Sequence, residues 1–250
     1  MSRIEAGHTV QGRDLSDEIW EGGDLSGLIL EACTLTDVSI SNTVLEEARF
    51  RRCRFIRCRF SHTDLREALF EDCQFNDPDN ANGASFSFSR LEQSVWKRCD
   101  LRRSVFEGVE LYAAAIEDCN LMGARFQRSN FAKAFGRNIV RTHGSFAGSN
   151  LELADMAGMK LPGLDLRRCR LRETDLSGAD LEGADLTGAD LFQAILNEAR
   201  LAKADLRDAE LSGVDPRILA SYADLKINVG QQHLLLTAMG IDVYPDATSQ

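Results

Sequence analysis

The chain has 250 residues, 44% of them hydrophobic and four of them proline, and its 39 acids and 29 bases give a formal charge of −10. This composition predicts one or two folded domains and excludes a disordered chain. The longest charge-free apolar stretch near the end, Leu234 to Ile241, is far shorter than the ~20 residues of a membrane span. The start lacks the apolar segment of a signal peptide, so we expect a cytoplasmic protein that spans no membrane. An acidic surface repels phosphate, so direct nucleic-acid binding is not expected and basic partners are favoured.

Apolar residues recur at every fifth position in two long runs. All thirteen such positions from Leu15 to Phe75 are apolar. After a shift of one residue, 24 of 26 positions from Phe86 to Leu211 are apolar, the exceptions being Gly136 and Arg141. Neither an α-helix nor a flat strand has a period of five.

A small residue stands two positions before each apolar centre, so two positions in five are predicted to face inward. A chain that turns a corner every five residues closes a square coil in about twenty, and stacked coils pair at the ~4.8 Å spacing of β-strands. The units at 179–183 (ADLEG) and 184–188 (ADLTG) resemble the A(D/N)LXX units of the pentapeptide-repeat family. That resemblance implies an all-β fold, a right-handed quadrilateral β-helix. We expect an N-terminal cap over 1–14, a β-helix of about ten coils and roughly 45 to 50 Å over 15–215, and a C-terminal segment over 216–250.

Seven cysteines suggest disulfides or zinc at first sight. All of them stand two residues before an apolar centre, in the slot that elsewhere holds Ala, Ser or Thr, which predicts small buried side chains. They are Cys33, Cys53, Cys58, Cys73, Cys99, Cys119 and Cys169. The four histidines lack metal-ligand spacing and no catalytic motif is present, so we expect no enzyme activity, no cofactor and no metal site.

The first interruption of the period covers 76–85. Either one step of five carries six extra residues as an outward loop, or two steps carry one bulged residue. The loop is favoured because Pro, Asn and Gly form turns, and because it places five phenylalanines on one wall. These are Phe60, Phe86, Phe106, Phe126 and Phe146.

The second interruption covers 132–145, where Gly136 and Arg141 fall at core positions. A buried unpaired arginine is too costly, so the segment is predicted to leave the wall as a loop carrying Lys133, Arg137, Arg141 and His143. The alternative is a wider coil in which Phe135 and Ile139 refill the core.

The period fades at Pro216, and residues 231–241 read as a short amphipathic helix that ends at Gly240. A solenoid needs its open end covered. The apolar residues of this segment either only cap the rod or also form an isologous homodimer contact, which we favour. The candidate contacts are Leu234, Leu235, Leu236, Met239 and Ile241.

Acidic residues concentrate in 174–215, which holds ten acids and three bases. Outward positions one coil apart should stack, so Asp165, Asp185 and Asp205 are predicted to form a column. Such a column either imitates the phosphates of DNA or satisfies N–H groups at the corners, and both can hold. Two basic clusters, 49–59 and 97–103, form either ion pairs across coils with Glu67, Glu71 and Asp72 or a nucleic-acid patch.

Several features together resemble the Qnr quinolone-resistance branch of the family. The first is the sequence CQF at 73–75, followed by a spacing of eleven residues from Phe75 to Phe86. The others are nine further steps of five from Phe86 to Phe131, a spacing of fifteen residues from Phe131 to Phe146, and the closing sequence LLLTAMGIDV. The resemblance implies a dimeric rod that binds DNA gyrase and topoisomerase IV and protects them from quinolones or other poisons, with both loops contacting the enzyme. The loop contacts would then be Asp77, Asp79 and Asn80, and Arg137, Arg141 and His143. The rival interpretation is a general interaction scaffold or bacterial effector with the same fold.

Overall fold

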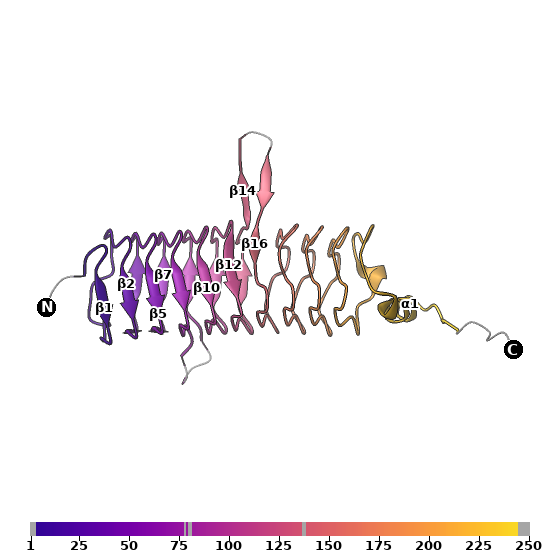
Figure 1. Cartoon of the computed structure of the whole chain (residues 1–250), viewed down its shortest axis with the longest axis horizontal. Coiled ribbons are helices and arrows are strands. Elements are labelled where there is room, and N and C mark those ends of the chain that lie inside the picture. Colours follow the sequence, from indigo (N-terminus) through magenta and orange to yellow (C-terminus); the bar gives the residue numbers. More distant parts are fainter. Residues whose placement is uncertain (1–3, 78, 80–81, 137–138, 245–250) are drawn as a thin grey trace.

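The computed structural model describes residues 4–77, 79, 82–136 and 139–244, which form one rod (Figure 1). The chain winds along the rod as a right-handed, four-sided β-helix, with its two termini at opposite ends. The predicted fold class is confirmed. The described residues contain no helix long and apolar enough to cross a membrane.

Parallel pairing between successive coils builds the four walls, which we number in the order that the chain passes through them. Wall 1 is a seven-stranded sheet of β1 (Thr9–Gln11), β2 (Ile29–Glu31), β5 (Arg49–Arg51), β8 (Leu69–Glu71), β10 (Val95–Lys97), β12 (Ala114–Glu117) and β16 (Gly144–Ser145). Wall 2 contains β3 (Thr34–Thr36) and β6 (Arg54–Ile56). Wall 3 contains β4 (Ser39–Ser41), β7 (Arg59–Ser61), β9 (Ser85–Ser87), β11 (Val105–Glu107) and β13 (Arg125–Gln127).

Wall 4 and the C-terminal coils are joined by single parallel bridges instead of longer strands. On wall 4 these bridges run through Asp24, Val44, Asp64, Arg90 and Glu110. The remaining elements are the hairpin strands β14 (Ala132–Ala134) and β15 (Val140–Thr142), the 3-10 turns η1 (Pro216–Ile218) and η2 (Val229–Gln231), and the helix α1 (Gln232–Ala238).

The core consists of the apolar centres predicted from the five-residue period. Aromatic side chains stack along the rod on two walls. On wall 1, the ring centroid of Phe70 lies 4.6 Å from that of Phe50 and 3.8 Å from that of Trp96. On wall 3, Phe86 stacks on Phe60 at 4.7 Å and on Phe106 at 5.0 Å. Burying such large side chains in every coil supplies the main stabilisation of the rod.

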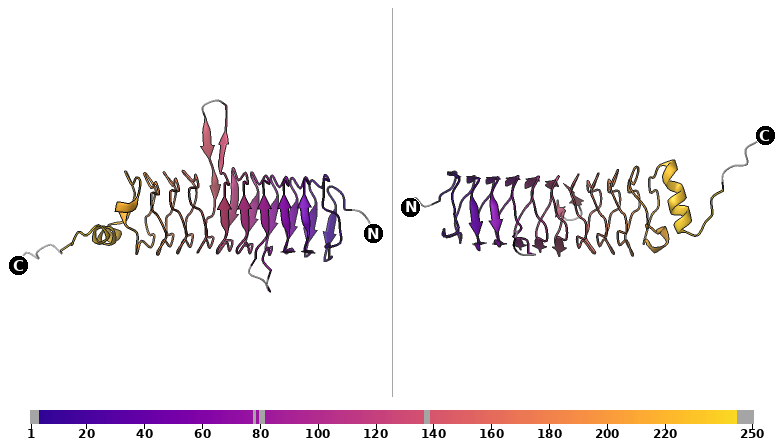
Figure 2. Two further views of the ribbon diagram at one scale, coloured as in Figure 1. Left: turned by 180° about the vertical axis from the view of Figure 1, so that it is seen from behind. Right: turned by 90° about the horizontal axis from the view of Figure 1, so that it is seen from below.

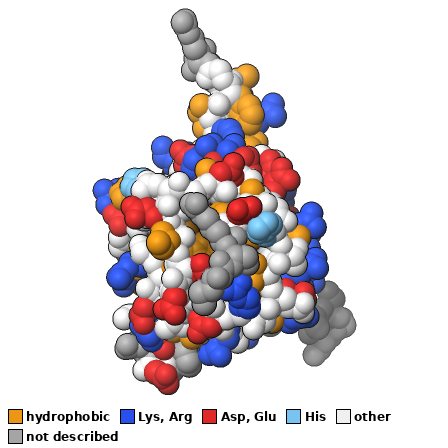
Figure 3. Space-filling view, turned by 90° about the vertical axis from the view of Figure 1, so that its left-hand side faces the viewer, with side chains coloured by type: hydrophobic (Ala, Val, Ile, Leu, Met, Phe, Trp, Pro, Cys, Tyr) orange, Lys and Arg blue, Asp and Glu red, His pale blue; other side chains and the backbone are white. Residues whose placement is uncertain are grey.

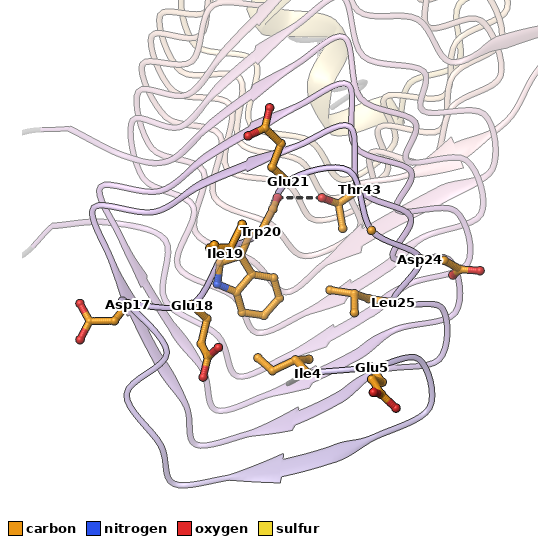
Figure 4. A pocket seen from close by; sticks show the side chains of 11 residues that line it. Ile4, Glu5, Asp17, Glu18, Ile19, Trp20, Glu21, Asp24, Leu25 and Thr43 are labelled. Atoms are coloured by element: carbon orange, nitrogen blue, oxygen red, sulfur yellow. Dashed lines mark hydrogen bonds between the residues drawn. The ribbon is translucent and has the colours of Figure 1, made fainter. Parts of the chain in front are cut away.

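The second inward position holds the cysteines, and all seven are free and buried, as predicted. Each thiol also donates a hydrogen bond to a backbone carbonyl of the preceding coil; the Sγ of Cys73, for example, lies 3.3 Å from the oxygen of Phe50. The hydroxyl of Thr43 makes the equivalent bond to Trp20 at 2.8 Å (Figure 4). This inward position therefore favours a short side chain that either is apolar or can donate a hydrogen bond to a backbone carbonyl of the preceding coil.

The coils extend beyond the predicted limits at both ends. β1 pairs with β2, so Val10 occupies the core position of a first coil, and the boundary of a cap at residue 14 is wrong. At the other end, bridges join Arg200 to Ser221 and Asp205 to Lys226, so the coils continue past 215. The paired residues of this last coil are 21 positions apart instead of 20, so a search for a strict period of five does not detect the coil.

The position of Phe146 also differs from the prediction. β16 pairs with β12, which places Phe146 after Ile116 on wall 1. The bridge from Arg125 to Asp155 instead brings Met156 beneath Phe126 on wall 3. The fifteen residues from Phe131 to Phe146 therefore make one step of five with ten extra residues, not three steps.

Each end of the rod is closed by side chains of its own chain. Trp20 packs near Ile4 and Leu25 at the N-terminal end (Figure 4), and its indole N–H donates to the carbonyl of Leu15. At the C-terminal end, Gln231 is buried and its Nε2 donates to the carbonyls of Leu206 and Ala209, both at 2.8 Å.

The helix α1 follows Gln231, within the range predicted for it. Gly240 ends this segment with a φ of 80°, a left-handed conformation in which glycine carries no steric penalty.

Replacing Gln231 by alanine is expected to lower the free energy of unfolding by about 2 kcal/mol, because two carbonyls at the buried end lose their donor. Chemical denaturation followed by circular dichroism measures the change. The matched control is Gln232→Ala, since Gln232 is the next residue, at the start of α1, and is exposed. Equal stabilities of the two variants would contradict the capping role of Gln231.

Candidate partner-binding surfaces

The first interruption leaves the rod as a loop at the corner between walls 2 and 3. β7 pairs with β9, so Phe60 and Phe86 face each other and one step of five carries the six extra residues, as favoured from the sequence. The loop is closed by an antiparallel bridge between Asn76 and Gly83. It projects from the rod in Figure 1, on the side opposite the hairpin.

The acidic residues of this loop have different environments. Asp77 is 4% exposed, and its Oδ2 accepts a hydrogen bond from Nη1 of Arg57 at 2.8 Å. The Arg57 guanidinium and the N–H of Asp79 hold the pKa of Asp77 below its usual range. Asp77 therefore fixes the loop to the rod and presents little surface to a partner. Asp79 is exposed, whereas Asn80 lies outside the described residues.

Arg57 joins this loop to the preceding coil, because it also binds Asp37 with its Nε at 2.6 Å. Replacing Arg57 by methionine should accelerate amide exchange at Asp77 and Asp79 by roughly tenfold, since a buried carboxylate loses its cation.

Acid should likewise reduce the protection of these amides in the unmodified loop, relative to their intrinsic exchange rates. The folded-state pKa values of Asp37 and Asp77 are lowered, so their contribution is present at neutral pH and is lost as the pH falls through those values. Protection factors measured by NMR at pH 7 and at about pH 2, each normalised to the intrinsic exchange rate at that pH, test both statements. An Arg49→Met variant, on the same coil, is the control, and equal exchange in the two variants would contradict the anchoring role.

The second interruption forms a β-hairpin at the corner between walls 4 and 1, diagonally opposite the loop (Figures 1 and 2). β14 and β15 are antiparallel, with Lys133 opposite Arg141. Phe135 and Ile139 are 44% and 52% exposed, so they do not refill the core and the wider coil is excluded. The segment leaves the wall, as predicted.

The hairpin combines apolar and basic side chains (Figure 3). The guanidinium of Arg141 is exposed and lies 5.8 Å from the centroid of the Phe135 ring. Val140 is 68% exposed, and His143 is exposed at the base of the hairpin. Arg137 lies outside the described residues. The exposed apolar surface on a projecting element is typical of a contact site for another protein.

The three aspartates predicted to stack do so, because bridges join Asp165 to Asp185 and Asp185 to Asp205. Each carboxylate also accepts a hydrogen bond from the N–H two residues later, at 3.0–3.2 Å. The stacking and the hydrogen bonds to corner N–H groups therefore coexist in the structure.

Two arginines whose pairing with these aspartates was not predicted offset the charge of this column. Arg167 contacts Asp165 at 2.6 Å and Asp185 at 3.7 Å, and Arg207 contacts Asp205 at 2.7 Å. These arginines hold the pKa values of Asp165 and Asp205 below their usual range. A repeated Asp-X-Arg spacing was the available signal. It occurs at 64–66, 100–102, 165–167, 205–207 and 215–217.

A less compensated acidic surface lies on wall 3. A bridge joins Asp155 to Asp175, one coil apart. Within the described part of the chain neither residue forms an ion pair, and their carboxylates accept only from the N–H groups of Ala157 and Ser177. These two aspartates fit a basic partner better than the column on wall 1 does.

The arginine cluster at 49–59 divides into paired and unpaired residues. Arg51 contacts Glu71 at 2.9 Å, and in the second basic cluster Arg98 contacts Asp72 at 2.7 Å. The expected ion pairs across coils are therefore present for both clusters. Arg49, Arg54 and Arg59 form no ion pair with the described residues, but they lie on three different walls. They cannot converge on one ligand.

The N-terminal end of the rod contains a hollow of about 650 Å³ beside Trp20 (Figure 4). Asp17, Glu18 and Glu21 are among the residues that line it. No group of three or more His, Cys, Asp or Glu side chains in the described ranges is arranged to hold a metal ion.

The residues predicted to form a dimer differ in exposure. Leu235 is 8% exposed and packs on the core of its own rod, so its assignment as a dimer contact is wrong. Leu236 and Met239 are half-buried. Leu234 and Ile241 are exposed, together with Val243 and Tyr244.

The chain is similar to several proteins of one family. Residues 48–126 match a profile described as a pentapeptide repeat region, and residues 149–188 and 184–215 match pentapeptide repeats. No curated protein sequence matches the chain.

Among solved structures, a trypsin-treated variant of QnrB1, a plasmid-mediated fluoroquinolone resistance protein, is 23% identical with a TM-score of 0.74. The alignment covers 95% of this chain and 99% of that one. Full-length QnrB1 is 22% identical with a TM-score of 0.73, and the alignment covers 94% of this chain and 100% of QnrB1. HetL from the cyanobacterium Nostoc, a protein involved in regulating heterocyst differentiation, is 22% identical with a TM-score of 0.51, covering 88% of this chain and 85% of HetL. Because the repeat profiles together match more than half of the sequence, and the coils they describe form the rod, the chain belongs to the pentapeptide-repeat family.

Proposed function

We propose that this protein binds DNA gyrase or topoisomerase IV and protects it from quinolones or other topoisomerase poisons, without catalysing a reaction. The observation that carries the proposal is the pair of projections at diagonally opposite corners of an otherwise regular, acidic rod. The similarity in fold to QnrB1 along nearly its whole length supports it. The protein would act in the cytoplasm.

The mechanism that we propose uses both kinds of surface. The acidic residues of the C-terminal coils, such as Asp155 and Asp175 on wall 3, meet the basic surface with which a topoisomerase binds DNA. The loop and the hairpin then fix the orientation of the rod. Its binding destabilises the complex of enzyme and poison. Complementary charge of this kind increases the association rate and weakens with salt.

The C-terminal end would join two rods in a homodimer. Leu234, Leu236, Met239 and Ile241 form the proposed contact, since they remain at least partly exposed next to the buried Leu235. Sedimentation of Leu234→Asp should show a monomer with an unchanged circular dichroism spectrum. A dimer that persists in this variant would reject the interface.

The function is tested by gyrase supercoiling with a fluoroquinolone present, titrating the protein over a wide concentration range. The register of the coils defines two excisions that keep the five-residue step. Removing 78–83 joins Asp77 to Ala84, and removing 133–142 joins Ala132 to His143. The intact rod should restore supercoiling, and each excised rod should fold normally but restore much less.

The same assay evaluates a second candidate function, an interaction scaffold for an unrelated partner. The mixed charge of the rod favours this candidate, because the arginines that pair with Asp165 and Asp205 reduce its likeness to DNA. A folded rod that neither restores nor inhibits supercoiling at any concentration would reject topoisomerase protection.

A further inference from the structure

The stem of the hairpin contacts the rod through one aromatic side chain, Tyr112 on wall 4. The ring of Phe135 lies 5.5 Å from the Tyr112 ring in an edge-to-face arrangement. The Nζ of Lys133 lies 5.6 Å from the centroid of the same ring, and the His143 ring lies 6.5 Å from it. Residues of β14, the tip and the base of the hairpin therefore converge on Tyr112. Each aromatic or cation–π contact of this kind contributes only a modest stabilisation. Together they fix the orientation of the hairpin relative to the rod.

A buried carboxylate lies near the same stem. The side chain of Glu92 is 6% exposed, and its Oε1 lies 3.8 Å from Nζ of Lys133 and 3.5 Å from Nη2 of Arg90. Its Oε2 has no hydrogen-bond partner among the described residues. A buried carboxylate without full hydrogen bonding is costly, so its attraction for a nearby cation is strong.

The other cations near Glu92 are already engaged. Arg66, in the preceding coil, contacts Asp64 at 2.7 Å and Glu46 at 3.2 Å. Arg90 also contacts Asp64, at 3.5 Å. Lys133 of β14 makes no other ion pair with the described residues, and therefore it is the cation that links Glu92 to the hairpin.

From these contacts we propose that Glu92 and Tyr112 are positioning residues that hold the hairpin at a fixed angle to the rod. A two-stranded hairpin is only marginally stable by itself, and the two strands of this one share three residue pairs. Attachment through Lys133 and Phe135 makes the hairpin a rigid arm. An arm that is ordered before binding loses less conformational entropy when it binds a partner.

The anchor also decides which side chains are available to a partner. Lys133 contacts Glu92 and Tyr112 while its side chain stays 44% exposed, and Ile139, Val140 and Arg141 are exposed without contacting either residue. The arm therefore presents apolar side chains together with two cationic ones, Lys133 and Arg141. It fits an apolar cleft bordered by carboxylates on the partner protein, and this consequence rests on the proposed function.

Electron-electron distance measurements on the full-length protein test the anchor without any partner. Spin labels are placed on the hairpin at Ile139→Cys and on wall 3 at Ala157→Cys. Both sites are exposed, while the seven native cysteines are buried. The parent pair should give a narrow distance distribution. Tyr112→Ala should roughly double its width, and Glu92→Gln should broaden it to a smaller extent.

Two conservative variants separate positioning from a general structural effect. Tyr112→Phe keeps the ring and should restore the narrow distribution. Glu110→Gln removes an exposed carboxylate on the same wall and should leave it unchanged. A broad distribution in the parent pair, or a narrow one in both Tyr112→Ala and Glu92→Gln, would overturn the proposal.

The gyrase assay on the same variants distinguishes failure of the anchor from failure of the proposed function. If Tyr112→Ala broadens the distribution and weakens protection, both proposals are supported. If it broadens the distribution while protection is unchanged, the anchor stands and the hairpin is not the contact with the topoisomerase. If protection falls while the distribution stays narrow, Tyr112 does not act by positioning the hairpin, and the anchor is rejected.

Discussion

Replacing Phe70 by alanine is expected to lower the free energy of unfolding by about 3–5 kcal/mol. Phe70 is fully buried and stacks between Phe50 and Trp96, with the ring of Phe75 packed edge-on at 5.6 Å. The substitution leaves a cavity between coils that cannot collapse, because backbone pairing fixes the coils at the spacing of β-strands. It also removes two aromatic stacks, each worth about 0.5–1.5 kcal/mol beyond the area that is buried.

Denaturation followed by circular dichroism and by tryptophan fluorescence measures this loss with two independent probes. Phe135→Ala is the matched control, since the same side chain is removed from an exposed position on the hairpin and should cost about 0.5 kcal/mol or less. A loss below about 1 kcal/mol for Phe70→Ala would mean that the aromatic column does not stabilise the rod as its burial indicates.

Charge reversal at Arg141 is the second change with a large expected effect, and it acts on function without altering stability. Arg141 is exposed on β15. Within the described residues, its guanidinium contacts the Phe135 ring and forms no ion pair. If the hairpin meets carboxylates on the topoisomerase, Arg141→Glu should raise the concentration needed for protection by roughly tenfold. The unfolding transition should not change.

Arg49→Glu provides the control for net charge. Arg49 is exposed on β5 and its neighbours in register are Ile29 and Leu69, so reversal there changes the total charge equally without altering the hairpin. The two variants are compared in the supercoiling assay at low and high salt. Equal protection by both variants at low salt would show that the partner does not recognise the positive charge of the hairpin.

Most of the fold could be predicted because the rule that forms it is local and repeats. Every fifth side chain is large and apolar, and the one two positions earlier is small, so each coil specifies its own inward residues. The same rule predicted that all seven cysteines are buried and that Asp165, Asp185 and Asp205 stack. Parallel pairing of equivalent residues in successive coils follows from that repetition.

The candidate surfaces were predicted less completely, since their properties depend on contacts between coils. Asp77 lies in a polar loop but is buried under Arg57 from the preceding coil. Arg167 spans two coils to reach Asp185, which reduces an acidic column that the sequence presents as uniform. Leu235 belongs to an amphipathic segment, but the open end of its own rod buries it.

The sequence by itself determined which side chains face inward, because a burial pattern with a period of five is compatible only with a chain that turns at that interval. It did not determine how the coils continue across an interruption, since fifteen residues equal either three steps or one step with ten extra. The tertiary structure decided this through the packing of Gly144 on wall 1. A Cβ at Gly144 would lie 2.6 Å from the ring of Phe131, so only glycine lets that ring close the corner while β16 pairs with β12. That close approach places Phe146 on Ile116 and sends the hairpin out of the wall, because the ten residues left over have no inward position to occupy.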